Sequence, residues 1–243
     1  MSCDYKRIGL PKINTLLKIL KSNKYVIYDK PFQLNIIGVR NLITNPEKFD
    51  DFIYVIFKND NNRWEGYRFN ATTDPSTRYL EKGGFSSSSS GTAILPQGQY
   101  VDTWRLGTHK GYRALVQNKK ICVYRDYDRN DTLNFNIEDK DCGFFGINIH
   151  RGKSHGADDG NGNTEYIGLY SAGCQVFANY YCFNEFMDLA EKQKNLYGNS
   201  FTYTLIDKSL QRKFIIKRSI FFLGLILGGF MIYKGVKSLR NAN

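Results

Sequence analysis

A histidine and a cysteine in the middle of the chain have the residue types needed for nucleophilic catalysis. His150 closes an apolar strand, and Cys174 ends a small-residue turn that also contains Ser171, Ala172 and Gly173. A thiol attacks as the thiolate, and a neighbouring imidazole can remove its proton at neutral pH. We therefore predict that Cys174 is a nucleophile and that His150 is its base.

The turn itself predicts two further contributions to such a site. Gly173 lets the backbone turn tightly, which leaves amide N–H groups near 173–174 to hold a tetrahedral oxyanion. Ser171 either accepts a hydrogen bond from the imidazole or shapes the turn. We also expect a helix just after Cys174, whose N-terminus would lower the pKa of the thiol further. A buried core cysteine and a satisfied strand-end histidine are the structural alternatives.

Three more residues are candidates for substrate binding. Arg151 can hold a carboxylate with its forked guanidinium, and Tyr170 can line the cleft. His109 can bring a second imidazole from another strand. Each has an ordinary alternative, namely a solvated arginine, an aromatic ring packed on the body, and an exposed turn residue.

The cysteines predict neither a zinc site nor a disulfide framework. Their number is odd, and no CxxC or Cys/His metal spacing occurs. We expect a reducing compartment, or a protein that does not depend on disulfides, with free thiols at Cys3, Cys122, Cys142 and Cys182. The acidic run from Asp126 to Asp131 lacks the glycine and glutamate of a calcium loop. No metal and no cofactor are therefore predicted.

The elements that position these residues are mainly strands. The chain has 243 residues, and aromatic residues make up 15% of them, which favours half-buried pleated surfaces. Strands are predicted at 34–39, 52–57, 64–69, 99–106, 112–117, 120–125, 144–149 and 201–206. A helix is predicted near 183–195 and an exposed loop at 152–164. We expect one mainly-β domain, a sandwich or barrel with short helices, over residues 25–207.

The two ends of the chain differ from this body. Residues 1–24 predict an amphipathic segment packed on the domain, because Ile13, Leu16, Leu17 and Leu20 recur at helical spacing. Its charged residues interrupt the apolar run that a signal peptide requires.

Residues 208–243 predict a basic juxtamembrane segment and a C-terminal hydrophobic helix that anchors the chain in a membrane at 219–236. The uncharged stretch 219–233 covers only about 22 Å as a helix, against a hydrocarbon core of about 30 Å, so the span must be thin or tilted. A buried core helix is the alternative. Gly224 and Gly228 form a GxxxG pair, which is suited to a homodimer but is weak evidence for one.

The net charge of +11 suits an anionic partner, such as nucleic acid, lipid or a cell-wall polymer. The basic residues are spread out, and no stripe of Lys and Arg alternates with stacking aromatics. We therefore expect no nucleic-acid partner. A nucleic-acid-binding protein, the alternative with least motif support, would show strongly salt-dependent retention on DNA.

The central segment resembles the catalytic domain of the L,D-transpeptidase family. The pair Ile149 and His150 matches the family's strand end, and Ser171, Gly173 and Cys174 match its Ser-His-Gly-Cys turn. Residues 91–100 are similar to its Thr-Pro-x-Gly-x-Phe/Tyr segment, and residues 71–74 to the short strand before it. The likeness spans roughly 70–190. The body also resembles a subfamily from bacteriophages and Bacteroidetes-type genomes with Ser-Ala-Gly-Cys in this turn.

Two departures from the family pattern affect what the resemblance implies. Ala172 stands where the family has a histidine, which removes an orienting or oxyanion-binding group. His109 is the residue that could supply the missing imidazole. The separation of His150 from Cys174, 24 positions, is longer than usual, with the extra residues in the 152–164 loop. A longer loop costs little to close and need not disturb the site.

The resemblance implies a cysteine-dependent peptidoglycan L,D-transpeptidase or L,D-peptidase, encoded by a phage or prophage, that acts on stem peptides through a Cys174 thioester. The alternative is a non-catalytic, membrane-anchored cell-wall-binding or structural protein on the same scaffold. Five basic residues precede the predicted anchor and three follow it, an excess that favours a cytoplasmic domain. A cell-wall substrate requires the opposite side of the membrane.

Overall fold

The computed structural model describes residues 3, 6–41, 45–81, 91–126, 128, 130, 132–133, 140–153 and 162–209. The chain divides into a compact unit, Met1–Asp207, and a second unit, Lys208–Asn243. Only the first two residues of the second unit are described. The predicted membrane segment 219–236 and its glycine pair, Gly224 and Gly228, lie outside the described residues. No helix of the described part is both long and apolar enough to cross a membrane.

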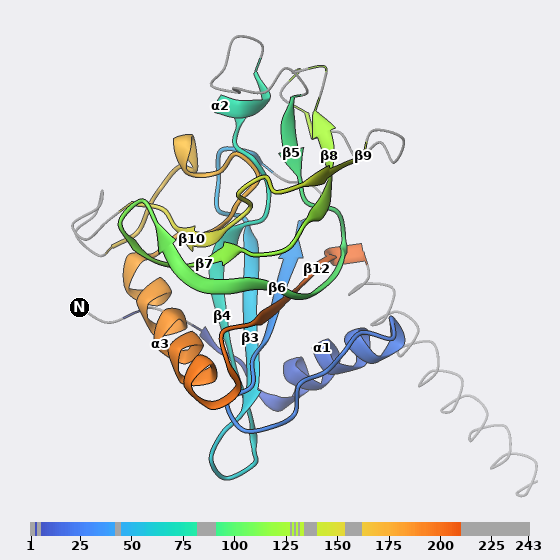
Figure 1. Cartoon of the computed structure of the whole chain (residues 1–243), viewed down its shortest axis with the longest axis vertical. Helices are drawn as coiled ribbons and strands as arrows, with labels where there is room; N and C mark the ends of the chain where they lie inside the picture. The colour runs from blue at the N-terminus through green and yellow to red at the C-terminus, as the bar shows by residue number, and fades with distance from the viewer. Residues whose placement is uncertain are drawn as a thin grey trace, which may run out of the picture. The chain divides into compact units, whose positions relative to one another are not determined.

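Eight strands of the first unit close into a barrel (Figure 1), which confirms the mainly-β prediction. Closure removes the exposed strand edges through which sheets aggregate. In barrel order the strands are β4 (Trp64–Thr72), β11 (Gln175–Phe177), β10 (Ile149–Arg151), β7 (Tyr112–Gln117), β6 (Gly98–His109), β12 (Phe201–Asp207), β2 (Asn35–Arg40) and β3 (Asp51–Lys58). The short strand β1 (Lys6–Arg7) adds to β4.

The apolar runs of the sequence become the interior of this barrel. Every residue of β2 is buried, and Trp104 of β6 and Tyr203 of β12 lie fully buried with their rings in edge contact, centroids 5.6 Å apart. Strands β3 and β4 form a hairpin in register over eight residue pairs. Strands of alternating or continuous Val, Ile and Phe therefore bury their side chains as their pattern predicts.

A second sheet joins β5 (Thr92–Ile94), β8 (Ile121–Asp126) and β9 (Lys140–Gly143). The predicted strand at 144–149 is wrong for most of its length, because only Ile149 is extended in a ladder and β9 ends at Gly143. Residues 144–148 instead run as irregular chain between the two sheets. The phenylalanine pair at 144–145 suggested a strand, whereas Gly146 at φ +69° breaks the extended run.

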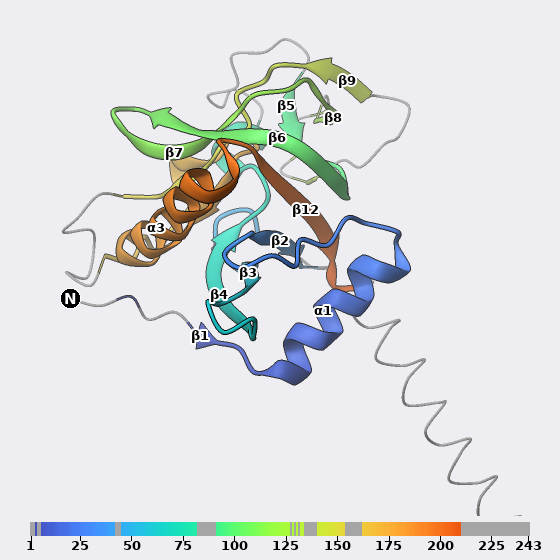
Figure 2. The ribbon, with the colours of Figure 1, turned by 60° about the horizontal axis from the view of Figure 1, so that its bottom comes forward.

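Helices cover the barrel on separate sides (Figure 2). Helix α1 (Leu10–Ser22) packs on β4 through Ile13, Leu16, Ile19 and Leu20. Leu17, expected in that stripe, is only half-buried. Helix α3 (Tyr180–Tyr197) packs on β10 and β11, and the short elements are α2 (Thr77–Leu80) and the 3-10 turn η2 (Gly168–Tyr170).

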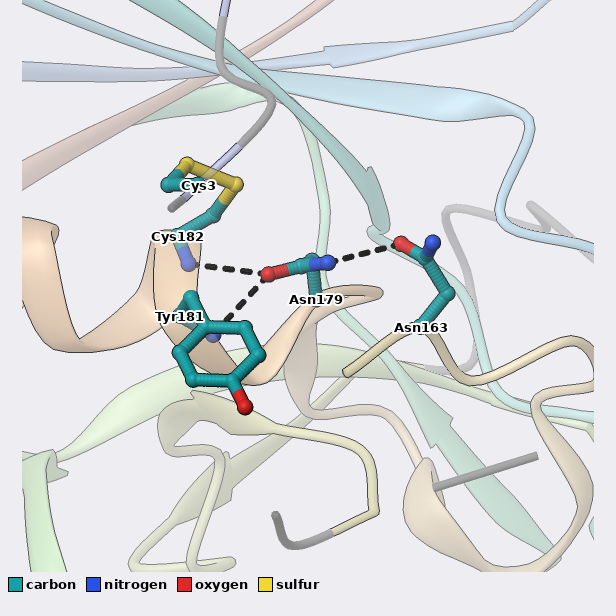
Figure 3. Close-up of a disulfide and its surroundings, with 5 residues drawn as sticks. All are labelled: Cys3, Asn163, Asn179, Tyr181 and Cys182. Carbon is teal, nitrogen blue, oxygen red and sulfur yellow. Dashed lines mark hydrogen bonds between the residues drawn. A yellow bond between two sulfur atoms is a disulfide. The ribbon is translucent and has the colours of Figure 1, made fainter. Parts of the chain in front are cut away.

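Two disulfides correct the expectation of free thiols. Cys122 pairs with Cys142 across β8 and β9, where the two residues lie opposite each other in the ladder. Cys3 pairs with Cys182 and ties the N-terminal segment to the first turn of α3 (Figure 3). Asn179 caps the same turn, since its Oδ1 accepts hydrogen bonds from the N–H groups of Tyr181 and Cys182. The odd cysteine is Cys174, the free thiol.

Candidate active site

The turn before Cys174 is held by the hydroxyl of Ser171, which is fully buried. Ser171 Oγ lies 2.7 Å from the carbonyl oxygen of Asp74 and 2.8 Å from that of Cys174, and it accepts a hydrogen bond from the Gly173 N–H at 3.3 Å. All three partners of the hydroxyl are backbone groups. Of the two roles expected for Ser171, the structure therefore has the turn-shaping one and not the imidazole contact.

Gly173 is the residue that this turn requires. Its φ is +109°, a conformation that side-chain-bearing residues rarely adopt. A Cβ at this position would lie 2.2 Å from the carbonyl oxygen of Ala93 in β5. Strand β5, at the start of the segment 91–100, thus lies directly against the turn.

Cys174 is half-buried, and a strand follows it rather than a helix. Strand β11 begins at Gln175, and α3 begins only at Tyr180, so the expected helix N-terminus is absent beside the thiol. The sulfur lies 3.4 Å from the backbone N–H of Asn148, from which it accepts, and 3.4 Å from the carbonyl of Gly146, to which it donates.

The two imidazoles predicted for the site lie against each other. His109, the last residue of β6, stacks on His150 of β10 with ring centroids 4.2 Å apart. The side-chain Nδ2 of Asn148 lies 3.1 Å from His109 Nδ1. Asn148 therefore contacts the thiol with its backbone and an imidazole with its side chain, which connects Cys174, Asn148, His109 and His150 through successive contacts.

The hydrogen bonds of His150 indicate its tautomer. Its Nδ1 lies 2.8 Å from the carbonyl oxygen of Arg151, and 3.3 Å from the hydroxyl of Tyr112. A carbonyl oxygen only accepts, so Nδ1 carries the proton. The lone pair of the neutral ring is then on Nε2, which is the atom available to act as a base.

The electrostatics keep all three groups neutral at pH 7. Burial, followed by the charge of His109, lowers the pKa of His150 to about 3. Burial, Lys110 and Arg151 also lower the pKa of His109. Burial raises the pKa of the Cys174 thiol to about 11, although the Asn148 N–H and Lys110 lower it in part. The depressed thiol pKa expected from a helix N-terminus is therefore wrong.

The remaining predicted residues lie around this cluster. The guanidinium of Arg151 lies 4.0 Å from the ring centre of Tyr112 and 5.0 Å from that of Tyr180. Arg151 also donates to the carbonyl of Gly152, so part of its fork is occupied. Tyr170 is half-buried at the end of η2, and its charge is close enough to raise the pKa of Tyr112.

Sequence reasoning missed Asn148, Tyr112 and Lys110. Asn148 precedes His150 by two residues, and alternate residues of an extended chain share a face. The spacing could therefore have predicted that Asn148 lies on the same face as His150. Tyr112 contacts both imidazoles, and the charge of Lys110 acts on both. These two residues and His109 belong to the β6–β7 hairpin, which only strand pairing brings alongside β10. Ala172, where the sequence resemblance leads one to expect a histidine, is exposed.

Among the described residues, no group of three or more metal-ligating side chains is found. Of the acidic run that imitates a calcium loop, Asp131 is not described, and Asn130 hydrogen-bonds Asp128. Comparisons with protein families, curated proteins and solved structures find no match to this chain.

Proposed function

We propose that the chain is a cysteine-dependent acyltransferase or hydrolase of the L,D-transpeptidase type that acts on peptidoglycan stem peptides. The observation that carries the proposal is the contact series from the Cys174 thiol through Asn148 to two stacked, neutral imidazoles. A free thiol and an imidazole whose Nε2 is unprotonated, connected here through Asn148 and His109, have the composition of a nucleophile and base pair. The family resemblance of the surrounding motifs supplies the substrate class.

In the proposed reaction the Cys174 sulfur attacks a stem-peptide carbonyl carbon, and the thiol proton passes to His150 Nε2. The carbonyl oxygen becomes an oxyanion, for which the Cys174 N–H is the natural donor, since this group donates to no acceptor within the described residues. The C–N bond then breaks, and the departing amine takes the proton from His150. An acceptor amine or water next attacks the thioester, which gives cross-linking or hydrolysis respectively.

The resting site requires proton transfer to accompany the attack. With the thiol pKa at about 11 and the His150 pKa at about 3, an imidazolium–thiolate pair does not form beforehand. The thiol donates to Gly146 O in the resting state, so its S–H group must turn about the Cβ–Sγ bond to direct the proton at a base. General-base catalysis of this kind does not need a stable thiolate.

The disulfides support an oxidising location for the first unit. Pairs such as Cys3–Cys182 and Cys122–Cys142 persist in secreted and periplasmic proteins and are rare in the cytosol. Peptidoglycan is in the same compartment. We infer that this unit faces the cell wall and that the hydrophobic segment 219–236 anchors it in the membrane, against the direction favoured by the charge count.

The test is mass spectrometry of muropeptides after incubation with the purified full chain. Cross-linked or trimmed stems are expected with the wild type, and they should disappear with Cys174→Ala and fall strongly with His150→Gln. Thr15→Ala in α1, outside the candidate site, is the control for differences between protein preparations, and it should give the same muropeptides as the wild type. Unchanged muropeptides from several peptidoglycan chemistries, with the protein folded, would remove the enzymatic proposal.

A second function, a non-catalytic cell-wall-binding or structural protein, has two observations in its favour. The raised thiol pKa and the replacement of the family's histidine by the exposed Ala172 are what a scaffold without catalysis would have. Sedimentation of the full chain with peptidoglycan sacculi distinguishes the two functions. Binding that is equal for the wild type and Cys174→Ala, without muropeptide change, would favour this alternative.

A further inference from the structure

A buried side-chain bridge connects β12 to the backbone of the Cys174 turn. The hydroxyl of Tyr203 donates to Gln175 Oε1 at 2.7 Å. Gln175 Nε2 in turn donates to the carbonyl oxygen of Gly173 at 3.2 Å and lies 3.5 Å from that of Thr73. Both side chains are wholly buried, with no exposed surface. The bridge therefore acts in a low dielectric, where leaving either polar group unpaired would be costly.

The bridge determines where the next amide points. A trans peptide unit is planar, and its C=O and N–H groups point in opposite directions. No cis peptide bond occurs in the described chain. Because Gln175 holds the Gly173 carbonyl toward the interior, the N–H of Cys174 in the same peptide unit must point the other way. On that side, no acceptor in the described ranges receives it.

The Tyr203 hydroxyl occupies a position in the barrel that is open only because residue 38 is glycine. A Cβ on Gly38 of β2 would lie 1.8 Å from the Tyr203 hydroxyl oxygen, so a glycine is required beside it. The Tyr203 ring is fixed by its edge contact with Trp104. The hydroxyl is thereby directed at Gln175 by packing on two sides.

We propose that Gln175 and Tyr203 are positioning residues that aim the Cys174 N–H at the oxyanion formed during acyl transfer. The inference rests on the proposed function for its chemistry, and on the peptide geometry for the orientation. Neither side chain touches the substrate in this role. The rate of a Cys174 reaction that passes through an oxyanion should therefore depend on the bridge. The rate of a reaction that forms no oxyanion should not.

The test compares two reactions of Cys174 in the full chain. Acylation by p-nitrophenyl acetate passes through a tetrahedral oxyanion, whereas alkylation by iodoacetamide does not. Tyr203→Phe and Gln175→Met are expected to slow acylation about tenfold, less than the loss of a whole oxyanion donor, with alkylation changed less than about twofold. Tyr100→Phe is the matched control, because Tyr100 also contacts Trp104 and donates to a backbone carbonyl, that of Pro96, outside the turn.

Two outcomes overturn the inference while leaving the proposed function in place. One is a parallel fall of acylation and alkylation, which would indicate a general structural role. The other is unchanged acylation in both variants. If Tyr203→Phe does not fold, Gln175→Glu replaces it, since a carboxylate accepts from Tyr203 but cannot donate to Gly173.

A second readout separates the inference from the proposed function. If the wild-type thiol is never acylated, the proposed function fails, and the orientation is then decided by the amide resonance of Cys174 in ¹H–¹⁵N spectra. Tyr203→Phe is expected to shift this resonance and to change its hydrogen-exchange rate, and Tyr100→Phe to leave both as in the wild type. A Cys174 amide that is identical in all three proteins would overturn the inference.

Discussion

The imidazole of His109 stacks on the imidazole of His150, with ring centroids 4.2 Å apart and ring planes 18° from parallel. Two positive charges at this separation repel, so a charge on His109 disfavours protonation of His150. Lys110 and Arg151 add to the effect on both rings, and burial adds more. The stack is therefore a pair of neutral bases at physiological pH rather than a cationic site.

The first prediction concerns the titration of this pair. NMR titration of the two imidazoles should show His150 neutral down to about pH 4, in line with a pKa of about 3, and His109 with a pKa below its ordinary value. His109→Phe keeps a stacked ring but removes its charge, so the pKa of His150 should rise. It should stay well below 6.5, because burial is the largest cause. A wild-type His150 that titrates near 6.5 would contradict the buried, stacked geometry.

The second prediction follows for stability. The folded pKa of His150 is depressed, so between about pH 6.5 and 3 the unfolded chain binds more protons and stability falls as the pH is lowered. Between pH 7.5 and 5.5 the wild type should lose about 1 kcal/mol of unfolding free energy relative to His150→Gln, measured by urea denaturation.

The comparison must be a difference between the two proteins, since a second group acts in the opposite direction. Burial and Asp74 raise the pKa of Asp51 to about 7, so the folded protein binds more protons there between about pH 4 and 7. That contribution to stability is lost as the pH rises, and it cancels when His150→Gln is compared with the wild type. If the difference in unfolding free energy between the wild type and His150→Gln did not change with pH, a neutral, buried His150 would be contradicted.

Sequence periodicity predicted most of the barrel, because its long strands bury continuous or alternating apolar residues. Strands β3 and β4 and helix α3 fall within a few residues of their expected bounds. The three-residue strands β5, β10 and β11 carry too few residues for a period, and only pairing with distant strands makes them extended. The phenylalanine pair at 144–145 suggested a strand from local sequence alone, although residues 144–148 pair with no strand.

The candidate site could be proposed from sequence only where its residues belong to local motifs. The order of the motifs suggested Cys174 and His150, and His109 was added because Ala172 stands where the resembled family has a histidine. The surroundings of the thiol could not be predicted, since they depend on which element follows the turn and on Asn148, brought alongside by parallel pairing of β10 with β11. The pairing of Cys3 with Cys182, 179 positions apart, likewise depends on how the N-terminal segment and α3 meet in the folded chain.

The third prediction is that Cys174 alkylates slowly. With the pKa of Cys174 raised to about 11, only a small fraction of the molecules carries a thiolate at pH 7.5. A thiolate of high pKa is more nucleophilic, but this compensates only partly for the small fraction. The iodoacetamide rate constant should be at least about tenfold below that of a free cysteine, and it should still rise above pH 9. Lys110→Met should lower it further, because Lys110 lowers the thiol pKa. A plateau below pH 8 would contradict burial of the thiol.

The fourth prediction concerns the disulfides. Denaturation without reductant should expose one alkylatable thiol, in the peptide that contains Cys174, and reduction should expose five. Replacing Cys3 and Cys182 together by alanine should lower the free energy of unfolding by about 3–5 kcal/mol, because their bridge closes a long loop. The Cys122 and Cys142 double variant is the comparison and should cost less, since its loop is short. Equal costs would contradict a chain-entropy origin.

The fifth prediction is the cost of a methyl group in the turn. Gly173→Ala must place a Cβ 2.2 Å from the Ala93 carbonyl while keeping φ at +109°, so the turn must shift. Strain and overpacking together should lower the free energy of unfolding by about 2–4 kcal/mol and abolish the reactivity that depends on the turn. Gly198→Ala is the matched control, because Gly198 also has a positive φ, +94°, but nothing lies within 4 Å of its added Cβ. It has the backbone strain without the overpacking, so it should cost less, about 1–2 kcal/mol. Equal costs in the two variants, measured by urea denaturation, would mean that the turn does not press against β5.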